Sequence, residues 1–285
     1  MPREVDLLPP STEAARKVKV VVASPSRSGT LGLYMAMKIL GYNTYHIYEC
    51  AAINGLDHLK VFNEGMIAQH NRLSGIKRYD KDDFDKWMAK YDCIVEIPSY
   101  MGTDLLEAYG QDPDVKFILT ERNPKKWALS VNNTAGQVVI AANKFPLNIL
   151  KYFEPTLYHF FRTNTLAYHI LAAGTKMGDK DNEKELVRFY ENYIKNAKAT
   201  IPADRLCHIH LDKDKLDWES ICPFLGVPVP KEDYPGRNEP EKFEILVKDF
   251  LDPLVKTAMF RLGAAVVGVL GLGWAAFQYG PSFLV

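Results

Sequence analysis

The chain has 285 residues, of which 47% are hydrophobic and 25% charged, values typical of a globular protein with a sizeable core. Lys and Arg total 35, as do Asp and Glu, so the net charge is zero and the overall balance does not favour nucleic acid as a partner. The four cysteines are scattered without a C-x-x-C pair, which indicates free thiols in a reducing compartment.

Residues 1–16 are predicted to be an N-terminal extension, because they carry acids and prolines and lack the apolar run of a signal peptide. From residue 17 onward, short β-branched runs alternate with helical periodicity. Strands are predicted over residues 17–23, 42–48, 92–97, 115–120 and 206–211. Helices are predicted over residues 30–40, 56–73, 82–90, 104–109, 124–143, 158–173, 183–199 and 218–225. This alternation predicts an α/β domain over residues 17–256, a P-loop-type parallel sheet flanked by helices.

Residues 257–285 form a hydrophobic tail. No charged residue occurs from Leu262 to Val285, a run about long enough to cross a ~30 Å hydrocarbon core as a helix. Lys248, Lys256 and Arg261 precede the run and no Lys or Arg follows it. This bias predicts a single-pass transmembrane anchor with a cytosolic catalytic body. The alternative is a core helix rich in Gly and Ala.

The first strand leads into a short loop and then a helix, which is a favourable context for binding an anion. Backbone N–H groups point outward at a helix N-terminus, where the helix dipole is positive, and an arginine adds a fixed cation. The candidate anion-binding residues are Ser26, Arg27, Ser28, Gly29, Thr30 and Leu31. The loop lacks the earlier Gly and the Lys-Ser/Thr pair of a Walker A motif. An ordinary strand–turn–helix connection is the alternative.

A second candidate follows the strand over residues 115–120. Arg122 comes directly after this strand, and Ser130 lies eight residues further on, about two turns into the next helix. Both side chains could reach one phosphate at the carboxyl edge of the sheet, where open α/β sheets bind ligands. The alternative is a surface arginine and an unrelated helix serine.

Together these elements resemble the PAPS-dependent sulfotransferase superfamily, in its branch with an R-T-G-T-like loop and an R-N-P-x-x-W-x-x-S helix. The resemblance rests on Pro25-Ser26-Arg27-Ser28-Gly29-Thr30 and on Arg122-Asn123-Pro124 with Ser130. It implies that PAPS is the co-substrate, without a metal. The first loop would hold the 5′-phosphosulfate, and Arg122 and Ser130 the 3′-phosphate. Arg237 would belong to a C-terminal loop that closes over the nucleotide. One departure is Ser24, where the family has Gly, because a side chain there could narrow the loop.

The same resemblance suggests a catalytic base. Sulfotransferases carry a His or a Glu at the end of the corresponding strand, and here Glu96 ends the strand over residues 92–97. A carboxylate in that place can accept the proton of a substrate hydroxyl or amine. Glu96 is therefore predicted to be the base, and Arg27 to stabilise the leaving phosphate. A structural role for Glu96, with His46 as the base, is the alternative.

The function implied is sulfuryl transfer from PAPS to a hydroxyl or amine of a small or lipophilic acceptor. The alternative is a membrane-bound P-loop protein that is inactive or transfers phosphate. The expected partners are the acceptor and, through the tail, a membrane, with homodimer formation left open. His208 and His210 lie on one face of a strand, but without further ligands nearby the spacing favours ordinary histidines over a zinc site.

Overall fold

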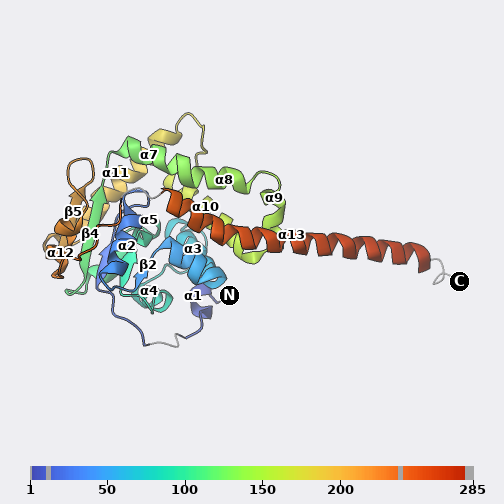
Figure 1. Ribbon diagram of the computed structural model, residues 1–285, viewed down its shortest axis with the longest axis horizontal. Helices are drawn as coiled ribbons and strands as arrows, with labels where there is room; N and C mark the ends of the chain where they lie inside the picture. Colours follow the sequence, from blue (N-terminus) through green and yellow to red (C-terminus); the bar gives the residue numbers. More distant parts are fainter. Residues whose placement is uncertain (1, 11–13, 237–239, 280–285) are drawn as a thin grey trace.

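The computed structural model describes the backbone of residues 2–10, 14–236 and 240–279, and its centre is a five-stranded parallel sheet (Figure 1). The strand order is β2–β3–β1–β4–β5, and β1 pairs with β3 on one side and with β4 on the other. The strands are β1 (Val20–Val22), β2 (Thr44–Tyr45), β3 (Cys93–Val95), β4 (Lys116–Glu121) and β5 (Leu206–His210). The predicted parallel α/β fold is confirmed.

Helices surround the sheet and connect its strands. They are α1 (Glu4–Leu7), α2 (Thr30–Ile39), α3 (Gly55–His70), α4 (Lys81–Trp87), α5 (Ile97–Met101), α6 (Asp104–Gly110), α7 (Pro124–Val131), α8 (Gln137–Ala142), α9 (Leu147–Leu150), α10 (Pro155–Leu171), α11 (Asn182–Thr200), α12 (Trp218–Leu225) and α13 (Pro240–Tyr279). Two π-helical segments, η1 (Glu49–Ile53) and η2 (Asn132–Gly136), and two 3₁₀ turns, η3 (Lys151–Phe153) and η4 (Ala203–Arg205), complete the set.

The central strands β1 and β3 are buried on both faces, which explains why they are continuous apolar runs. Successive residues of β1 face opposite sides, because side chains alternate along a strand. Val21 joins the larger core with residues of α3, α4, α6, α7, α10 and α11. Val20 and Val22 join a second core with residues of α2 and α12. The sheet is thus sandwiched between two helical layers.

Three predicted elements differ from those observed. The strand predicted over residues 42–48 is reduced to β2, because the chain turns into η1 soon afterwards. The strand predicted over residues 92–97 stops at Val95, since Glu96 has a left-handed φ of 60° and α5 begins at Ile97. The helix predicted over residues 124–143 contains the π-helical segment η2, which separates α7 from α8.

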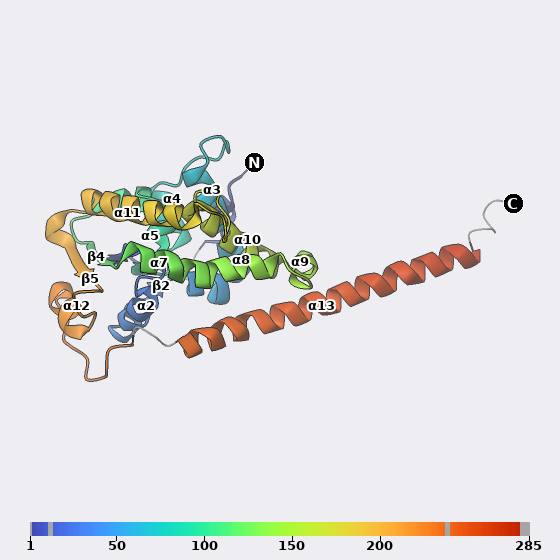
Figure 2. The same ribbon diagram turned by 90° about the horizontal axis from the view of Figure 1, so that it is seen from above.

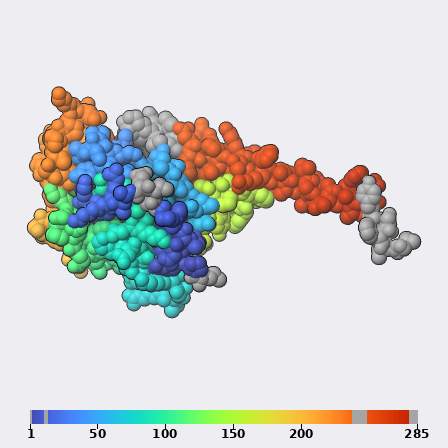
Figure 3. Space-filling view, turned by 90° about the horizontal axis from the view of Figure 1, so that it is seen from below, coloured from blue at the N-terminus to red at the C-terminus, as the bar shows by residue number. Residues whose placement is uncertain are grey.

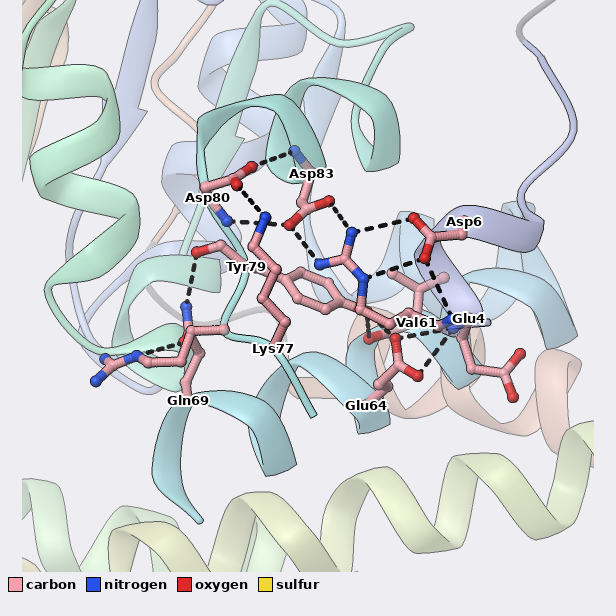
Figure 4. A network of polar contacts seen from close by, with 11 residues as sticks. Glu4, Asp6, Val61, Glu64, Gln69, Lys77, Tyr79, Asp80 and Asp83 are labelled. Carbon is pink, nitrogen blue, oxygen red and sulfur yellow. Dashed lines mark hydrogen bonds and ion pairs between the residues drawn. The ribbon is translucent and has the colours of Figure 1, made fainter. Parts of the chain in front are cut away.

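The N-terminal segment packs on the body. Val5 in α1 is fully buried, and the backbone N–H of Glu4 donates to both carboxylate oxygens of Glu64 at 2.9 Å. The Arg3 guanidinium donates to both oxygens of Asp83 at 2.7 Å. Figure 4 shows Asp83, Asp6 and Glu64 around this segment. We call this set of contacts the N-terminal clamp.

The C-terminal helix α13 leaves the body and projects far beyond it (Figures 1 and 2). Its first half packs through Leu251, Leu254 and Ala258 on a small core formed with α8, α9 and α10. The stretch Lys248–Gln278 is long and apolar enough to cross a membrane, and its most apolar window has a mean hydropathy of 1.7 with no buried residue. The alternative of a buried core helix is therefore wrong. The boundary expected after residue 256 falls inside α13.

Candidate active site

The predicted site residues gather at the carboxyl edge of the sheet, where the parallel strands end together. The loop after β1 lies beside Glu96, which follows β3, and the backbone N–H of Glu96 donates to the carbonyl of Val22 at 3.1 Å. Arg122 follows β4 and His46 follows β2. Four connections that are distant in the sequence thus contribute to one site.

The loop from β1 to α2 ends in a helix N-terminus suited to an anion. The Ser28 N–H donates to the Pro25 carbonyl at 3.1 Å and closes a turn, and Gly29 takes a φ of 82° at the N-cap. Gly29 has no side chain that could cap the helix. The first N–H group bonded within the helix is that of Leu33, which donates to the Gly29 carbonyl. The N–H groups of Thr30 and Leu31 therefore have no partner within the helix. An anion at this end would be favoured by these donors and by the helix dipole.

Ser24 does not narrow the loop, contrary to the expectation from its departure from Gly. Its side chain is fully buried, and its Oγ accepts the Thr120 N–H at 2.8 Å. The Thr120 hydroxyl in turn donates to the Ser28 carbonyl. On the other side, the Trp127 indole N–H donates to the Ser26 carbonyl at 2.8 Å. The extra hydroxyl of Ser24 thus ties the loop to β4.

The two predicted anion-binding elements meet in one cluster. Arg27 Nε donates to Ser130 Oγ at 3.3 Å, and Arg122 Nη1 donates to the Arg27 carbonyl at 2.9 Å. The Arg122 N–H donates to the Tyr190 hydroxyl at 2.8 Å, which fixes the start of the β4–α7 connection. Burial raises the pKa of Tyr190 to about 12, so this phenol is neutral. Arg27 therefore links the two elements, through its side chain to Ser130 and through its carbonyl to Arg122.

Glu96 forms a buried polar group with two neighbours. It is 1% exposed, its Oε1 lies 2.9 Å from His46 Nε2, and its Oε2 accepts the Thr30 hydroxyl at 2.8 Å. Burial alone would raise the pKa of Glu96. The neighbouring His46 ring, together with hydrogen bonds from Thr30 and Ser26, outweighs burial and holds this pKa below its usual value. The carboxylate is ionised at neutral pH.

The tautomer of His46 follows from its other ring nitrogen. Nδ1 accepts the Tyr48 N–H at 3.1 Å, so the proton of the neutral ring is on Nε2, which faces Glu96. The two alternative bases are thus in direct contact. The ring is also stacked on Tyr34 at a centroid distance of 4.9 Å. The Tyr34 hydroxyl donates to Glu49 at 2.6 Å, so a second polar pair supports the histidine.

Backbone strain is concentrated at this edge of the sheet. Arg27 has a φ of 70° and Glu96 a φ of 60°. Both angles fall in the left-handed region of backbone conformation, which residues other than glycine rarely adopt. Ala173 is the third residue of this kind in the described part of the chain. Each such conformation costs about 1–3 kcal/mol, and such strain is typically found at functional sites.

The segment before α13 covers the first turn of α2. A Cβ added to Gly32 would lie 3.2 Å from the Pro235 carbonyl oxygen, so a larger residue there would require this segment to move by a few tenths of an ångström. The Trp218 indole N–H donates to the Glu232 carbonyl at 2.7 Å and holds this segment in place. Arg237, predicted to contact the nucleotide, lies outside the described residues.

Other features of the site were not found by sequence reasoning. Tyr34 and Tyr190 lack a local signal, because their contacts depend on how distant helices pack. A cavity of about 300 Å³ is lined, among others, by Ser99 and Tyr193, whose hydroxyls bond to the backbone at this edge of the sheet. The Ser99 hydroxyl donates to the Glu96 carbonyl, and the Tyr193 hydroxyl donates to the Ala23 carbonyl at 2.6 Å.

His208 lies away from this cluster, with its Nε2 2.9 Å from Glu121 Oε2. Glu121 is also paired with Lys198 at 2.5 Å. Over residues 2–10, 14–236 and 240–279, no three His, Cys, Asp or Glu side chains lie together in a way that could hold a metal ion. His208 is accounted for by its ion pair with Glu121.

Comparison with known proteins agrees with this geometry. Residues 19–243 match the model of the sulfotransferase domain family, so the chain belongs to that family, as its loop and helix motifs predicted. It is 28% identical over 219 residues to the Ava biosynthesis cluster protein M of Aspergillus versicolor, with coverage of 76% of this chain and 80% of the relative. A sulfotransferase structure from Alicyclobacillus acidocaldarius is 14% identical, with a TM-score of 0.39 and coverage of 88% and 96%. Because of that low score, the assignment rests on the family match.

Proposed function

We propose that this sulfotransferase uses PAPS as its donor and transfers the sulfuryl group to a hydroxyl or amine of a small, lipophilic acceptor. The observation that carries the proposal is the meeting of two anion-binding elements with a buried, ionised carboxylate at one edge of the sheet. Arg27, Arg122 and Ser130 belong to the two anion-binding elements, and Glu96 is the carboxylate. Bound PAPS would supply the sulfuryl group.

The donors of the site fit the two phosphate-bearing ends of PAPS. The N–H groups at the start of α2 and the Arg27 guanidinium suit the 5′-phosphosulfate. Arg122 and Ser130 suit the 3′-phosphate, since a guanidinium fork and a hydroxyl match the oxygens of a phosphate monoester. Because Arg27 and Ser130 are already in contact, both ends of the nucleotide would bind to one connected set of donors.

In this proposal Glu96 takes the proton of the acceptor. It is ionised, buried and held by His46 and Thr30, so it needs no reorganisation before it accepts a proton. His46 acts as a positioning residue that fixes the carboxylate. Arg27 and the α2 N–H groups stabilise the charge that develops on the leaving phosphate. The chain thus divides the work between proton acceptance and anion stabilisation.

We further propose that α13 anchors the enzyme in a membrane with the body on the cytosolic side. The support is the exposed apolar stretch of α13 and the cations Lys248, Lys256 and Arg261 at its body end. The cavity lined by Ser99 and Tyr193 has a volume at the lower end of the range of small-molecule pockets. An anchored enzyme would meet lipophilic acceptors that partition into the bilayer.

Calorimetry on the full chain in detergent tests the choice of donor. We expect PAP to bind with a Kd on the order of micromolar, and Arg122→Ala to weaken it by about 10²-fold, since a charge-assisted phosphate contact is lost. ADP, which lacks the 3′-phosphate, should bind as weakly to wild type as PAP binds to the variant. Lys125→Ala is the matched control, because Lys125 is an exposed cation in α7, the helix that follows Arg122.

Two results would contradict the proposal. Failure of the folded protein to bind PAP would favour an inactive family member. Equal affinity for ADP and PAP, together with Mg²⁺-dependent ATP hydrolysis, would favour phosphoryl transfer.

A further inference from the structure

Three large hydrophobic side chains are exposed on one corner of the body. Phe145 is 80% exposed, Ile149 is 42% exposed and Tyr152 is 68% exposed. They lie within eight residues of each other, just before α9, within it and in the η3 turn that follows. We call this group the α9 corner. Clustered apolar exposure of this kind indicates a contact with an apolar partner.

The α9 corner lies beside the point where α13 leaves the body. Leu150 and Phe153, from the same turns, pack with Val255, Ala258 and Leu262 of α13. Figure 1 shows α9 against α13, and in Figure 3 the yellow-green atoms that precede and form α10 lie at the base of the helix. The corner is therefore level with the residues at which the uncharged part of α13 begins.

A hydrogen bond from the last charged residue of α13 holds the α9 corner and α13 together. Arg261 Nη1 donates to the Phe153 carbonyl at 3.2 Å and lies 3.9 Å from Glu154. After Arg261, α13 continues through exposed Val267, Leu270 and Trp274 without a charge. A membrane crossed by this stretch would begin at the level of Arg261, and so at the α9 corner.

The charges around the corner suit a phospholipid surface. Two cations, Lys144 and Lys151, lie next to these residues in the sequence, and two more, Lys256 and Arg261, lie on α13. The acid next to these turns is Glu154, which is buried and faces Arg261, whereas Asp252 lies on α13 one turn before Lys256. Lys151 Nζ lies 5.5 Å from the centroid of the Tyr152 ring. Cations beside aromatic side chains are typical of membrane interfaces, and an anionic surface favours them further.

We propose that the α9 corner is a second membrane contact, in which Phe145, Ile149 and Tyr152 enter the boundary between headgroups and acyl chains of the bilayer that α13 crosses. This inference rests on the proposed membrane anchor. The occupant is a phospholipid surface, because the corner is continuous with the exposed apolar face of α13 and is bordered by cations. The body is thereby held against the membrane at a fixed orientation, whereas a flexible tether would leave it free to rotate.

Fluorescence quenching in vesicles of phosphatidylcholine and phosphatidylserine tests this contact with the full chain. A bimane label is placed at Phe145→Cys, and lipids with a nitroxide near the headgroup are added as quenchers. We expect the signal to fall by about half, since an interfacial residue lies ~5–10 Å into the boundary. Leu73→Cys is the matched control, because Leu73 is 96% exposed and lies in the α3–α4 connection. The wild-type protein, treated with the same label, shows how much of the fluorescence comes from the partly exposed Cys207.

A third label separates the corner from the anchor. Leu272→Cys, in the exposed part of α13, reports insertion of the helix through quenching by lipids with a deep nitroxide. Quenching at residues 145 and 272, with none at residue 73, supports the proposal. Quenching at residue 272 alone overturns the membrane contact and leaves the anchor standing. If neither site is quenched and sedimentation shows dimers, the corner binds a second copy of the chain, and both membrane proposals fail.

Discussion

Glu96 and Asp83 are both buried carboxylates beside a nitrogen donor, but their surroundings differ. Asp83 lies in the regular helix α4, accepts two bonds from Arg3 and one from the Asp80 N–H, and closes a capping box. Glu96 lies on left-handed backbone at the edge of the sheet, with His46 and Thr30 as neighbours. Asp83 only holds two segments together, so its carboxylate can have all its hydrogen bonds while its backbone stays in an unstrained helical conformation. The carboxylate that we propose as the base lies instead on strained backbone at the edge of the sheet.

Glu96→Gln gives the sharpest test of this contrast. We expect the rate of sulfuryl transfer to fall by about 10²–10⁴-fold, since the amide cannot accept the proton, while PAP affinity stays unchanged. The measurement is PAP release from PAPS with 2-naphthol as the acceptor. The Asp83→Asn variant should keep wild-type activity in the same assay. Wild-type turnover by the Glu96→Gln variant would remove Glu96 from the proposed mechanism.

Arg3→Ala tests the other carboxylate. Removal of Arg3 leaves Asp83 buried without its partner, so the free energy of unfolding should fall by about 3 kcal/mol. Chemical denaturation followed by circular dichroism measures this change, and turnover at a temperature where the variant is folded should be unaltered. Arg72→Ala is the control, because Arg72 is exposed and its loss should change stability by less than about 0.5 kcal/mol. An unchanged midpoint for Arg3→Ala would show that the clamp is not stabilising.

The smallest expected effect concerns pH. Because the pKa of Glu96 is held below its usual value, its contribution to stability is present at neutral pH and is lost only as the pH falls through the folded-state value. Activity should therefore persist into mildly acidic solution. In His46→Ala the effect of burial dominates, the pKa of Glu96 rises, and the acidic limb of the kcat/KM profile moves to higher pH. A profile that keeps its position would mean that His46 does not control the ionisation of Glu96.

Local sequence patterns predicted the sheet, most helices and the position of the β1–α2 loop and of Arg122 at one edge of the sheet. They succeed where one connection supplies its own signal, as when Arg122 follows a strand and Ser130 lies two turns into the next helix. They could not pair His46 with Glu96, because that contact depends on β2 lying next to β3. The N-terminal clamp was missed for the same reason, since Arg3 and Asp83 are eighty positions apart.

The C-terminal helix shows a further limit of local patterns. The tail was predicted from residue 257 because its charge-free run starts nearby. The helix begins at Pro240, since Leu251 and Leu254 find apolar partners on α8, α9 and α10. A charged stretch before an apolar helix becomes part of that helix when its apolar residues find partners on the body. Hydropathy along the sequence does not reveal those partners.

The left-handed residues Arg27 and Glu96 also bear on engineering. Glycine adopts that conformation without a steric penalty, so glycine at either position would relieve strain. A library sorted only for thermal resistance would then enrich glycine at positions 27 and 96 and lose both side chains. Any stabilised variant of this protein should therefore be selected with these two codons held constant.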